Sequence, residues 1–306
     1  MAPSFVDATA IQAVDSHTYA ATFHSEWCVG SVPHGGVVTS VFLRVAATHF
    51  GTTLAAQRQP HTISLHVEFL RRTQEGPATL TVRDIKLGRQ TSTIHVVLSQ
   101  EDREEVVGYL TQSNMATETG PSLQTLWSLH PAPPPPPADF LKLLQGDKDP
   151  DWVELTDNPY KKFRKVANRV RTFLPRHGQV VPGVIDEWLR FESGERFTNE
   201  SVGFVSDNFP SVLDGLWRMA EGEKRLPSFW YPTVALNLDV KKVLPPEGVA
   251  WLFVRVRAKV IQNGRMDLEV TILDEAGDVI ALSHHVVLVV GAERNMAARR
   301  NGQTKM

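Results

Sequence analysis

The sequence is poor in the residues that build redox and zinc sites, because its 306 residues include a single cysteine, Cys28. One cysteine excludes an intrachain disulfide, a cysteine zinc site and a CxxC redox pair. Cys28 is itself a candidate nucleophile, but no activating motif surrounds it, and such a residue is more often a buried small hydrophobe. GxSxG, Walker, GxGxxG and HExxH motifs are absent too, so no motif-bearing catalytic or nucleotide site is indicated.

Long apolar runs and excess charge are also missing. No stretch reaches the roughly 18 apolar residues that indicate a membrane-spanning helix, and the N-terminus lacks the basic start and apolar run of a signal peptide. The formal net charge is -2, so no overall basic field attracts nucleic acid or anionic membranes. These absences predict a soluble, cytoplasmic protein without a nucleic-acid or membrane partner. A local basic pocket for a phosphorylated ligand stays open.

The composition is that of a globular chain, with 42% hydrophobic and 22% charged residues. At roughly 100–200 residues per domain, the length suggests about two domains. The proline-rich segment 131–140 cannot form a helix or a central strand, and it is typical of a polyproline II spacer or surface crossing, with an SH3-type ligand as the alternative. We therefore expect an N-terminal domain at 1–115, a linker at 116–160 and a C-terminal domain at 161–306.

The first half is expected to consist of one helix followed by strands. A Gly-Gly start and an apolar face that includes Val37, Val41 and Val45 predict a buried helix over 37–50. Alternating apolar and polar residues predict a four-stranded antiparallel meander. Its strands are expected at 61–72, 78–88, 92–100 and 106–114.

The second half repeats this order, and the repeat is the most informative pattern in the chain. The run TISLHVE that begins at Thr62 corresponds to TVALNLD from Thr233, and Gly88-Arg89 corresponds to Gly264-Arg265. A helix is expected over 207–222. Strands are expected at 165–175, 184–192, 232–242, 251–260, 266–274 and 278–290.

The runs HGGVVTSVFLRVA, LHVEFLRR, the Gly-Arg turn and VIDEWLRFE followed by SDNFP resemble the double-hotdog acyl-CoA thioesterase-like family, including its thioesterase II type. The resemblance covers nearly the whole chain outside the proline-rich linker. It implies an α+β fold, a tandem (double) hotdog with two antiparallel sheets, each wrapped around a central helix. The two hotdogs are expected to pack edge to edge, so that their sheets form one long sheet. The resemblance also implies an acyl thioester bound between the halves, and a homo-oligomer is compatible with such a fold. The absent motifs and metal spacings predict no cofactor and no metal.

The start of the first helix is the expected place for the thioester. A helix N-terminus presents unpaired N–H groups and partial positive charge, and glycine lets a ligand approach the backbone. Gly35 and Gly36 are therefore candidates for polarising the thioester carbonyl, with a simple tight turn as the alternative. His34 is a candidate for orienting the thioester or activating water, with a structural cap as the alternative.

Asp207 is the best carboxylate for a catalytic base, since it lies where the second helix is expected to begin and corresponds to His34 in the repeat. The resemblance implies this role, because hotdog thioesterases of several kinds use a carboxylate near the central helix as base or nucleophile. It is also a plausible N-cap of the helix over 207–222, with Pro210 in the first turn, where proline is tolerated. A plain N-cap is thus the alternative role, and Asp214 is a weaker candidate for the base.

The resemblance points to further positions that hold water in such enzymes. In the second half, the acidic residue that such enzymes carry early in the first long strand aligns with Ala235, and alanine cannot activate water. The hydroxyl or amide groups that the family uses near a later turn align with Gln262 and Asn263. The glutamine that it uses on the last strand aligns with His285.

Four residues are candidates for binding the rest of the substrate. Arg89 and Arg265 follow the repeated glycines and suit coenzyme A phosphates, with solvated turn residues as the alternative. Trp27 and Trp230 are candidates for lining an acyl pocket, although such aromatic residues more often belong to a core. His284 and His285 are neighbours on a strand and point to opposite faces, so they are not expected to chelate one metal ion.

Three hypotheses about function follow. The first is hydrolysis of an acyl-CoA or carrier-bound thioester to the free acid, with Asp207 or His285 as base and Gln262 positioning water. The second is non-hydrolytic tailoring, such as isomerisation, dehydration or cyclisation of a polyketide-like or other secondary metabolite. It is motivated by the alanine at 235 and by the suitability of His285 for acid–base work. The third is non-catalytic acyl binding.

Overall fold

The computed structural model describes residues 2–146, 149–157, 161–221 and 228–296. The described helices are α1 (Phe5–Ala8), α2 (Gly35–Gly51), α3 (Phe140–Leu144), α4 (Val202–Val205), α5 (Val212–Glu221) and α6 (Glu293–Met296). The strands of the first half are β1 (Ile11–Ala13), β2 (Thr18–Phe23), β3 (Cys28–Val29), β4 (Val32–Pro33), β5 (His61–Phe69), β6 (Gly76–Lys86), β7 (Ser92–Gln100) and β8 (Arg103–Ser113). Those of the second half are β9 (Trp152–Glu154), β10 (Val170–Pro175), β11 (Val184–Phe191), β12 (Phe229–Trp230), β13 (Thr233–Val240), β14 (Leu252–Arg257), β15 (Ile261–Gln262), β16 (Arg265–Leu273), β17 (Val279–Leu288) and β18 (Val290–Gly291).

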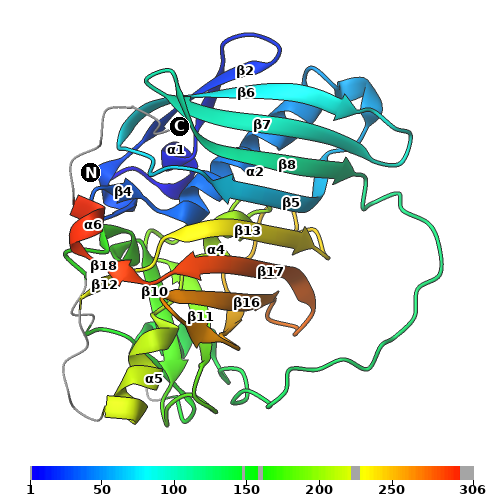
Figure 1. The fold of residues 1–306 in the computed structure, drawn as a ribbon. Coiled ribbons are helices and arrows are strands. Elements are labelled where there is room, and N and C mark those ends of the chain that lie inside the picture. The colour runs from blue at the N-terminus through cyan, green and yellow to red at the C-terminus, as the bar shows by residue number, and fades with distance from the viewer. Residues whose placement is uncertain (1, 147–148, 158–160, 222–227, 297–306) are drawn as a thin grey trace.

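The two halves share one 14-stranded sheet, in the order β1-β2-β6-β7-β8-β5-β13-β17-β16-β14-β11-β10-β9, with β15 paired to β16 (Figure 1). At its centre β5 pairs antiparallel with β13, with Leu65 opposite Leu238 and Val67 opposite Leu236. The two expected sheets are therefore joined edge to edge into one sheet in the described part of the chain. Pairing β5 with β13 satisfies the backbone groups that two separate sheets would leave open along those edges.

The order of strands within each half also differs from the predicted meander. β5 pairs with β8, whereas β6 pairs with β2 and β7. The connection after β5 therefore has to cross the end of the β7–β8 hairpin. The Gln100 side chain holds this crossing: its amide accepts from Gln74 N at 2.8 Å and donates to the carbonyls of Gln74 and Pro77. Alternation predicts where strands form, but it carries no information on which strands become neighbours.

The expected helix over 207–222 is shorter, and it begins after Asp207. Helix α4 ends at Val205, and α5 begins at Val212, so Asp207 lies in the connection and is not the N-cap of α5. Pro210 explains the break, because a proline disfavours helical geometry in the residue before it and has no N–H to donate. The side chain of Asp214, within α5, lies outside the described residues.

Helix α2 occupies the core as its apolar pattern predicts. Val37, Val38, Val41, Phe42 and Val45 on it are at most 1% exposed. The limits of nine strands differ from the predicted ones by no more than three residues, namely those of β5, β6, β7, β8, β11, β13, β14, β16 and β17. The small helix α4 packs across α2 so closely that a Cβ at Gly203 would lie 3.0 Å from the backbone nitrogen of Ser40.

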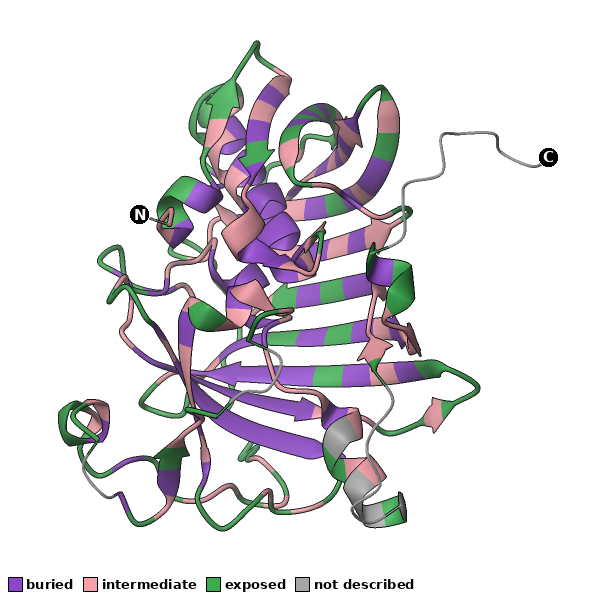
Figure 2. Cartoon of the chain, turned by 90° about the vertical axis from the view of Figure 1, so that its left-hand side faces the viewer, coloured by how far each residue is buried: buried purple, intermediate pink, exposed green. Residues whose placement is uncertain are grey.

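The two halves differ in how their sheet faces are covered. On β6 buried residues alternate with exposed ones, whereas seven of the eight residues of β11 are buried (Figure 2). The segment that contains the prolines covers the outer face of the second half, since Trp152 donates from Nε1 to the Pro135 carbonyl. A second hydrophobic cluster lies on this face, formed by Leu143, Trp152, Phe173, Trp188, Trp251, Phe253 and Leu273. The proline-rich segment is thus a surface crossing that packs against the sheet.

Candidate active site

The carboxyl group of Asp207 lies at the N-terminus of α2. A Cβ placed on Gly35 would come within 2.8 Å of Asp207 Oδ2, and one on Gly36 would meet the backbone of Phe204 at 2.8–2.9 Å. The two glycines therefore allow α4 and Asp207 to approach the start of α2. The side chain of Asp207 is 12% exposed, so the carboxyl remains within reach of a ligand while it is largely shielded from water.

His34 is the N-cap of α2 and faces Asp207 from one side. Its Nδ1 accepts a hydrogen bond from the Gly36 N–H at 3.2 Å and lies 3.8 Å from Asp207 Oδ2. Because Nδ1 accepts, the proton of the neutral ring is on Nε2. Burial lowers the pKa of His34 to about 3, helped by the charge of Arg164 and opposed by a contact with the Asp207 backbone. The ring is thus neutral at physiological pH.

His285 faces the same carboxyl from β17. Its Nε2 lies 2.8 Å from Ser283 Oγ, which itself donates to the carbonyl of Asn237 at 2.6 Å. Nε2 therefore carries the proton, and Nδ1 presents a lone pair 3.6 Å from Asp207 Oδ1. His285 is fully buried, and burial lowers its pKa to about 3, with a smaller effect from His284.

The surroundings of Asp207 favour its protonated form. Burial raises the pKa of this carboxyl from its ordinary 3.8 to about 7, against the opposing effects of the Gly36 N–H, the Thr233 hydroxyl and Arg164. The open lone pair of His285 Nδ1 acts in the same direction as burial, since it favours a protonated carboxyl and offers nothing to an ionised one. A carboxyl that titrates near neutral pH suits general acid–base chemistry.

Two residues near Asp207 were missed by sequence reasoning. Thr233, at the start of β13, donates from its hydroxyl to Asp207 Oδ1 at 3.4 Å. The repeat included this position, but no motif in the sequence indicated that its hydroxyl contacts Asp207. Arg164 donates from Nη2 to the Phe209 carbonyl at 2.8 Å. Its charge also acts on Glu187, a fully buried carboxyl whose pKa burial raises well above the ordinary range.

The remaining expected site residues do not gather at Asp207. Gln262 is exposed on β15, Arg89 is exposed in the turn after β6, and Arg265 is exposed at the start of β16. Among the described residues, no hydrogen bond or ion pair joins any of these three to Asp207. Arg265 lies opposite Leu288 on β17, at the same end of the sheet as His285, whereas Arg89 follows β6 at the far end.

The expected aromatic and thiol candidates are found mainly in the core. Trp27 is 2% exposed and packs edge-on against Phe5 and Phe204. Trp230 is half-buried on β12, paired with Val290. Cys28 is 1% exposed, and burial raises the pKa of its thiol to about 12, so the thiolate that a nucleophile needs is strongly disfavoured.

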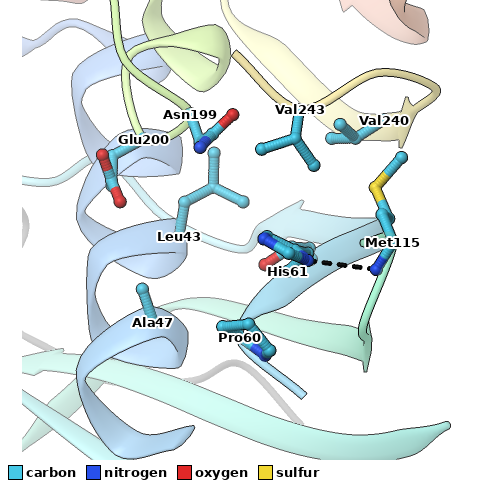
Figure 3. A pocket seen from close by; sticks show the side chains of 10 residues that line it. Leu43, Ala47, Pro60, His61, Met115, Asn199, Glu200, Val240 and Val243 are labelled. Carbon is cyan, nitrogen blue, oxygen red and sulfur yellow. Dashed lines mark hydrogen bonds between the residues drawn. The ribbon is translucent and has the colours of Figure 1, made fainter. Parts of the chain in front are cut away.

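A cavity of about 50 Å³ lies at the other end of the central strand pair. Figure 3 shows Leu43 and Ala47 of α2 facing it opposite His61, Val240 and Val243. The repeat relates Thr62, which also lines it, to Thr233 at the Asp207 end. The cavity is thus the counterpart, in the first half, of the candidate active site. It has room for a few water molecules, so it does not accommodate a long acyl chain.

A buried acid–base carboxyl at a helix N-terminus, set against a long antiparallel sheet, defines a hotdog-type α+β protein with a candidate hydrolytic site. Two family models match the chain: the acyl-CoA thioesterase N-terminal domain over residues 23–113 and the acyl-CoA thioesterase C-terminal domain over residues 131–289. The chain belongs to this acyl-CoA thioesterase family.

Individual relatives are similar over almost the whole chain. The thioesterase-like protein TwmA of Talaromyces wortmannii is 33% identical, over 98% of this chain and 96% of its own length. A hot dog fold protein from Alicyclobacillus acidocaldarius superposes with a TM-score of 0.71 at 18% identity, over 95% of this chain and 99% of its own. The acyl-CoA thioesterase II TesB2 of Mycobacterium marinum gives 0.64 at 16% identity, over 94% and 97%. Both solved structures support the hotdog-like fold. No helix in the described ranges has the length and apolar character needed to span a membrane.

Proposed function

We propose that the chain hydrolyses an acyl thioester, carried by coenzyme A or by a carrier protein, to the free acid. The observation that supports this most strongly is the position of Asp207 at the N-terminus of α2, between two neutral histidines, with its pKa raised to about 7. A base with that pKa removes a proton from water near neutral pH while its conjugate acid still protonates a leaving group.

In the proposed reaction the ionised Asp207 takes a proton from a water molecule as the water oxygen attacks the thioester carbonyl carbon. The carbonyl oxygen becomes an oxyanion beside the N-terminus of α2 at Gly35 and Gly36, where the helix carries partial positive charge. Collapse of the tetrahedral intermediate breaks the carbon–sulfur bond. The proton held by Asp207 then passes to the leaving thiolate, so the carboxyl returns to its ionised form.

His285 and Thr233 are assigned the role of positioning residues. Thr233 Oγ1 lies 3.4 Å from one Asp207 oxygen, and His285 Nδ1, which has no hydrogen-bond partner among the described residues, lies 3.6 Å from the same oxygen. A buried acceptor without a partner is costly, and a water molecule bound between these groups would satisfy it. Gln262 is given no role, because it is exposed on β15.

A thiol-release assay tests this proposal. The wild-type chain is expected to release free thiol from at least one of a panel of short, medium, long and aromatic acyl-CoAs and acyl-carrier proteins, with the free acid as coproduct. His285→Ala should lower kcat by about tenfold or more with little change in KM, since it positions water and not substrate. Folded protein that releases no thiol from any of these substrates would contradict hydrolysis and favour tailoring or acyl binding.

The pH dependence provides a second test. Because the base must be ionised, kcat/KM should rise with pH up to the pKa of Asp207, about 7, and level off above it. Between pH 5.5 and 7.5 the expected increase is about 25-fold. The two histidines, with pKa values of about 3, stay neutral throughout this range. A profile that is flat from pH 5.5 to 8 would show that Asp207 is not the base.

A further inference from the structure

Three ionisable side chains gather at the opposite end of α2 from the candidate active site. His17 precedes β2, His49 lies in the last turns of α2, and Asp84 lies on β6. His49 and the cap residue His34 are about 22 Å apart along the helix axis. The group is thus separate from Asp207 and takes no part in the proposed hydrolysis.

Each of the three occupies a position where the local pattern calls for an apolar residue. Tyr19 and Ala21 on β2, and Leu80 and Val82 on β6, point into the core and are at most 7% exposed. His17 and Asp84 continue these inward-facing rows by two residues each, because alternate residues of a strand share a face.

His49 meets them from the third element. It is fully buried on α2. Polar groups in such places are unfavourable unless they are partnered, and here both histidines have Asp84 as their partner.

We propose that His17, His49 and Asp84 bind a divalent transition-metal ion, and that their donor set suits Zn²⁺. The donor atoms all lie within 4.8 Å of one another. His49 Nε2 is 3.1 Å from Asp84 Oδ1, and His17 Nε2 is 3.4 Å from Asp84 Oδ2. Ligands at ordinary zinc distances in a tetrahedral site are separated by about 3.3 Å, so an ion fits with little movement.

The second nitrogen of each histidine supports this assignment. His49 Nδ1 lies 3.0 Å from the Tyr19 hydroxyl, and His17 Nδ1 lies 2.9 Å from Ser16 Oγ. Ligating histidines commonly donate the other ring N–H to such an acceptor, which orients the ring and directs the second nitrogen at the metal. The backbone of His17 is also held, because its N–H donates to Asp15 Oδ1 and its carbonyl accepts from Val82 N, both at 2.8 Å.

The two imidazoles and one carboxylate determine which metal ion the site prefers. Imidazole nitrogen favours Zn²⁺ and its neighbours over Mg²⁺ and Ca²⁺, which prefer oxygen. His17 is 42% exposed, so the fourth position faces solvent, where water completes the coordination. The ion would tie the β1–β2 hairpin at the edge of the sheet to the end of α2.

The sequence predicted no metal, because these ligands show no paired metal spacing. The site is formed by three elements that only the fold brings together, so spacing along the chain could not reveal it.

Zn²⁺ titration of chelator-treated protein, followed by calorimetry, tests the proposal. The wild-type chain is expected to bind one ion with micromolar or tighter affinity. At a free Zn²⁺ concentration about 100 times the dissociation constant, the midpoint of thermal unfolding should rise by about 4 °C. Mg²⁺ at the same concentration should have no such effect.

Variants assign the ion to these side chains. His17→Ala and Asp84→Asn should each weaken binding at least tenfold. The matched control is His66→Ala, which removes a histidine of nearly equal exposure, 43%, that pairs with Glu68 elsewhere. Wild-type protein that binds no ion at about 50 µM Zn²⁺, or binding that both variants retain, would overturn the proposal. Loss of binding only in His34→Ala would assign the ion to the Asp207 site and overturn it equally.

Discussion

Replacing Asp207 by asparagine is expected to lower kcat for thioester hydrolysis by about 10²–10⁴-fold, the usual contribution of a general base. The amide keeps the size of the side chain and its contacts with Gly36 and Thr233, but it cannot take a proton from water. KM should change little, because the proposed role of the carboxyl is in the transition state. Steady-state thiol release at pH 8, where wild-type Asp207 is ionised, measures the difference.

Stability separates this catalytic role from a structural one. The folded-state pKa of Asp207, about 7, lies above its ordinary 3.8, so ionisation opposes folding increasingly as the pH rises from about 4 to about 7. Below this window both states are protonated and there is no such effect. Asp207→Asn should therefore be at least as stable as the wild type at pH 8, as judged by urea unfolding.

The control for this variant is Asp239→Asn, which makes the same change on β13 at a side chain that is 53% exposed. It should leave both activity and stability unchanged. An Asp207→Asn protein that is active, or one that is inactive only because it has lost several kcal/mol of stability, would show that the carboxyl has a structural role.

Replacing Arg255 by methionine is expected to destabilise the fold by about 3–5 kcal/mol, because it leaves a buried carboxylate without its partner. Arg255 donates from Nε and Nη2 to the two oxygens of Asp186 at 2.6 and 2.7 Å. The two side chains are 6% and 0% exposed. Urea titration of the wild type and the variant at pH 7 measures the loss in the free energy of unfolding.

The same arginine anchors the proline-rich crossing, since its Nη1 donates to the Pro131 carbonyl at 2.6 Å. Arg255→Met should therefore also make this crossing more susceptible to limited proteolysis. The double variant Asp186→Leu with Arg255→Met should recover most of the stability, because a well-packed apolar pair can replace a buried ion pair.

The control is Lys259→Met, which breaks an ion pair with Glu269. The side chains of this pair are 56% and 47% exposed, so the variant should lower the free energy of unfolding by only about 0–1 kcal/mol. Equal effects of Arg255→Met and Lys259→Met would contradict the assignment of stability to the buried pair.

Much of the candidate site could be predicted from the start of the first helix, the repeat and the family resemblance. Asp207, His34 and His285 were all expected near the thioester, and the structure places both histidines within 4 Å of the carboxyl. Their roles could not be predicted. Gly35 and Gly36 were expected to contact the thioester, and their lack of side chains also lets Asp207 and Phe204 approach α2, which the sequence did not indicate. Thr233 was visible only as the first residue of a repeated strand.

The sequence by itself determined the local structure: a buried helix where apolar residues recur every three to four positions, strands where they alternate, and a duplicated order of elements. These features depend on neighbours along the chain. They can be recognised in the sequence because residues three or four apart share a face of a helix, and alternate residues share a face of a strand. The sequence could not determine that β5 pairs with β13, that α4 crosses α2, or that Asp207 and the group of His17, His49 and Asp84 lie at opposite ends of one helix. Only the tertiary structure decided these, because pKa values and metal geometry depend on distances between residues far apart in the chain, which no local pattern encodes.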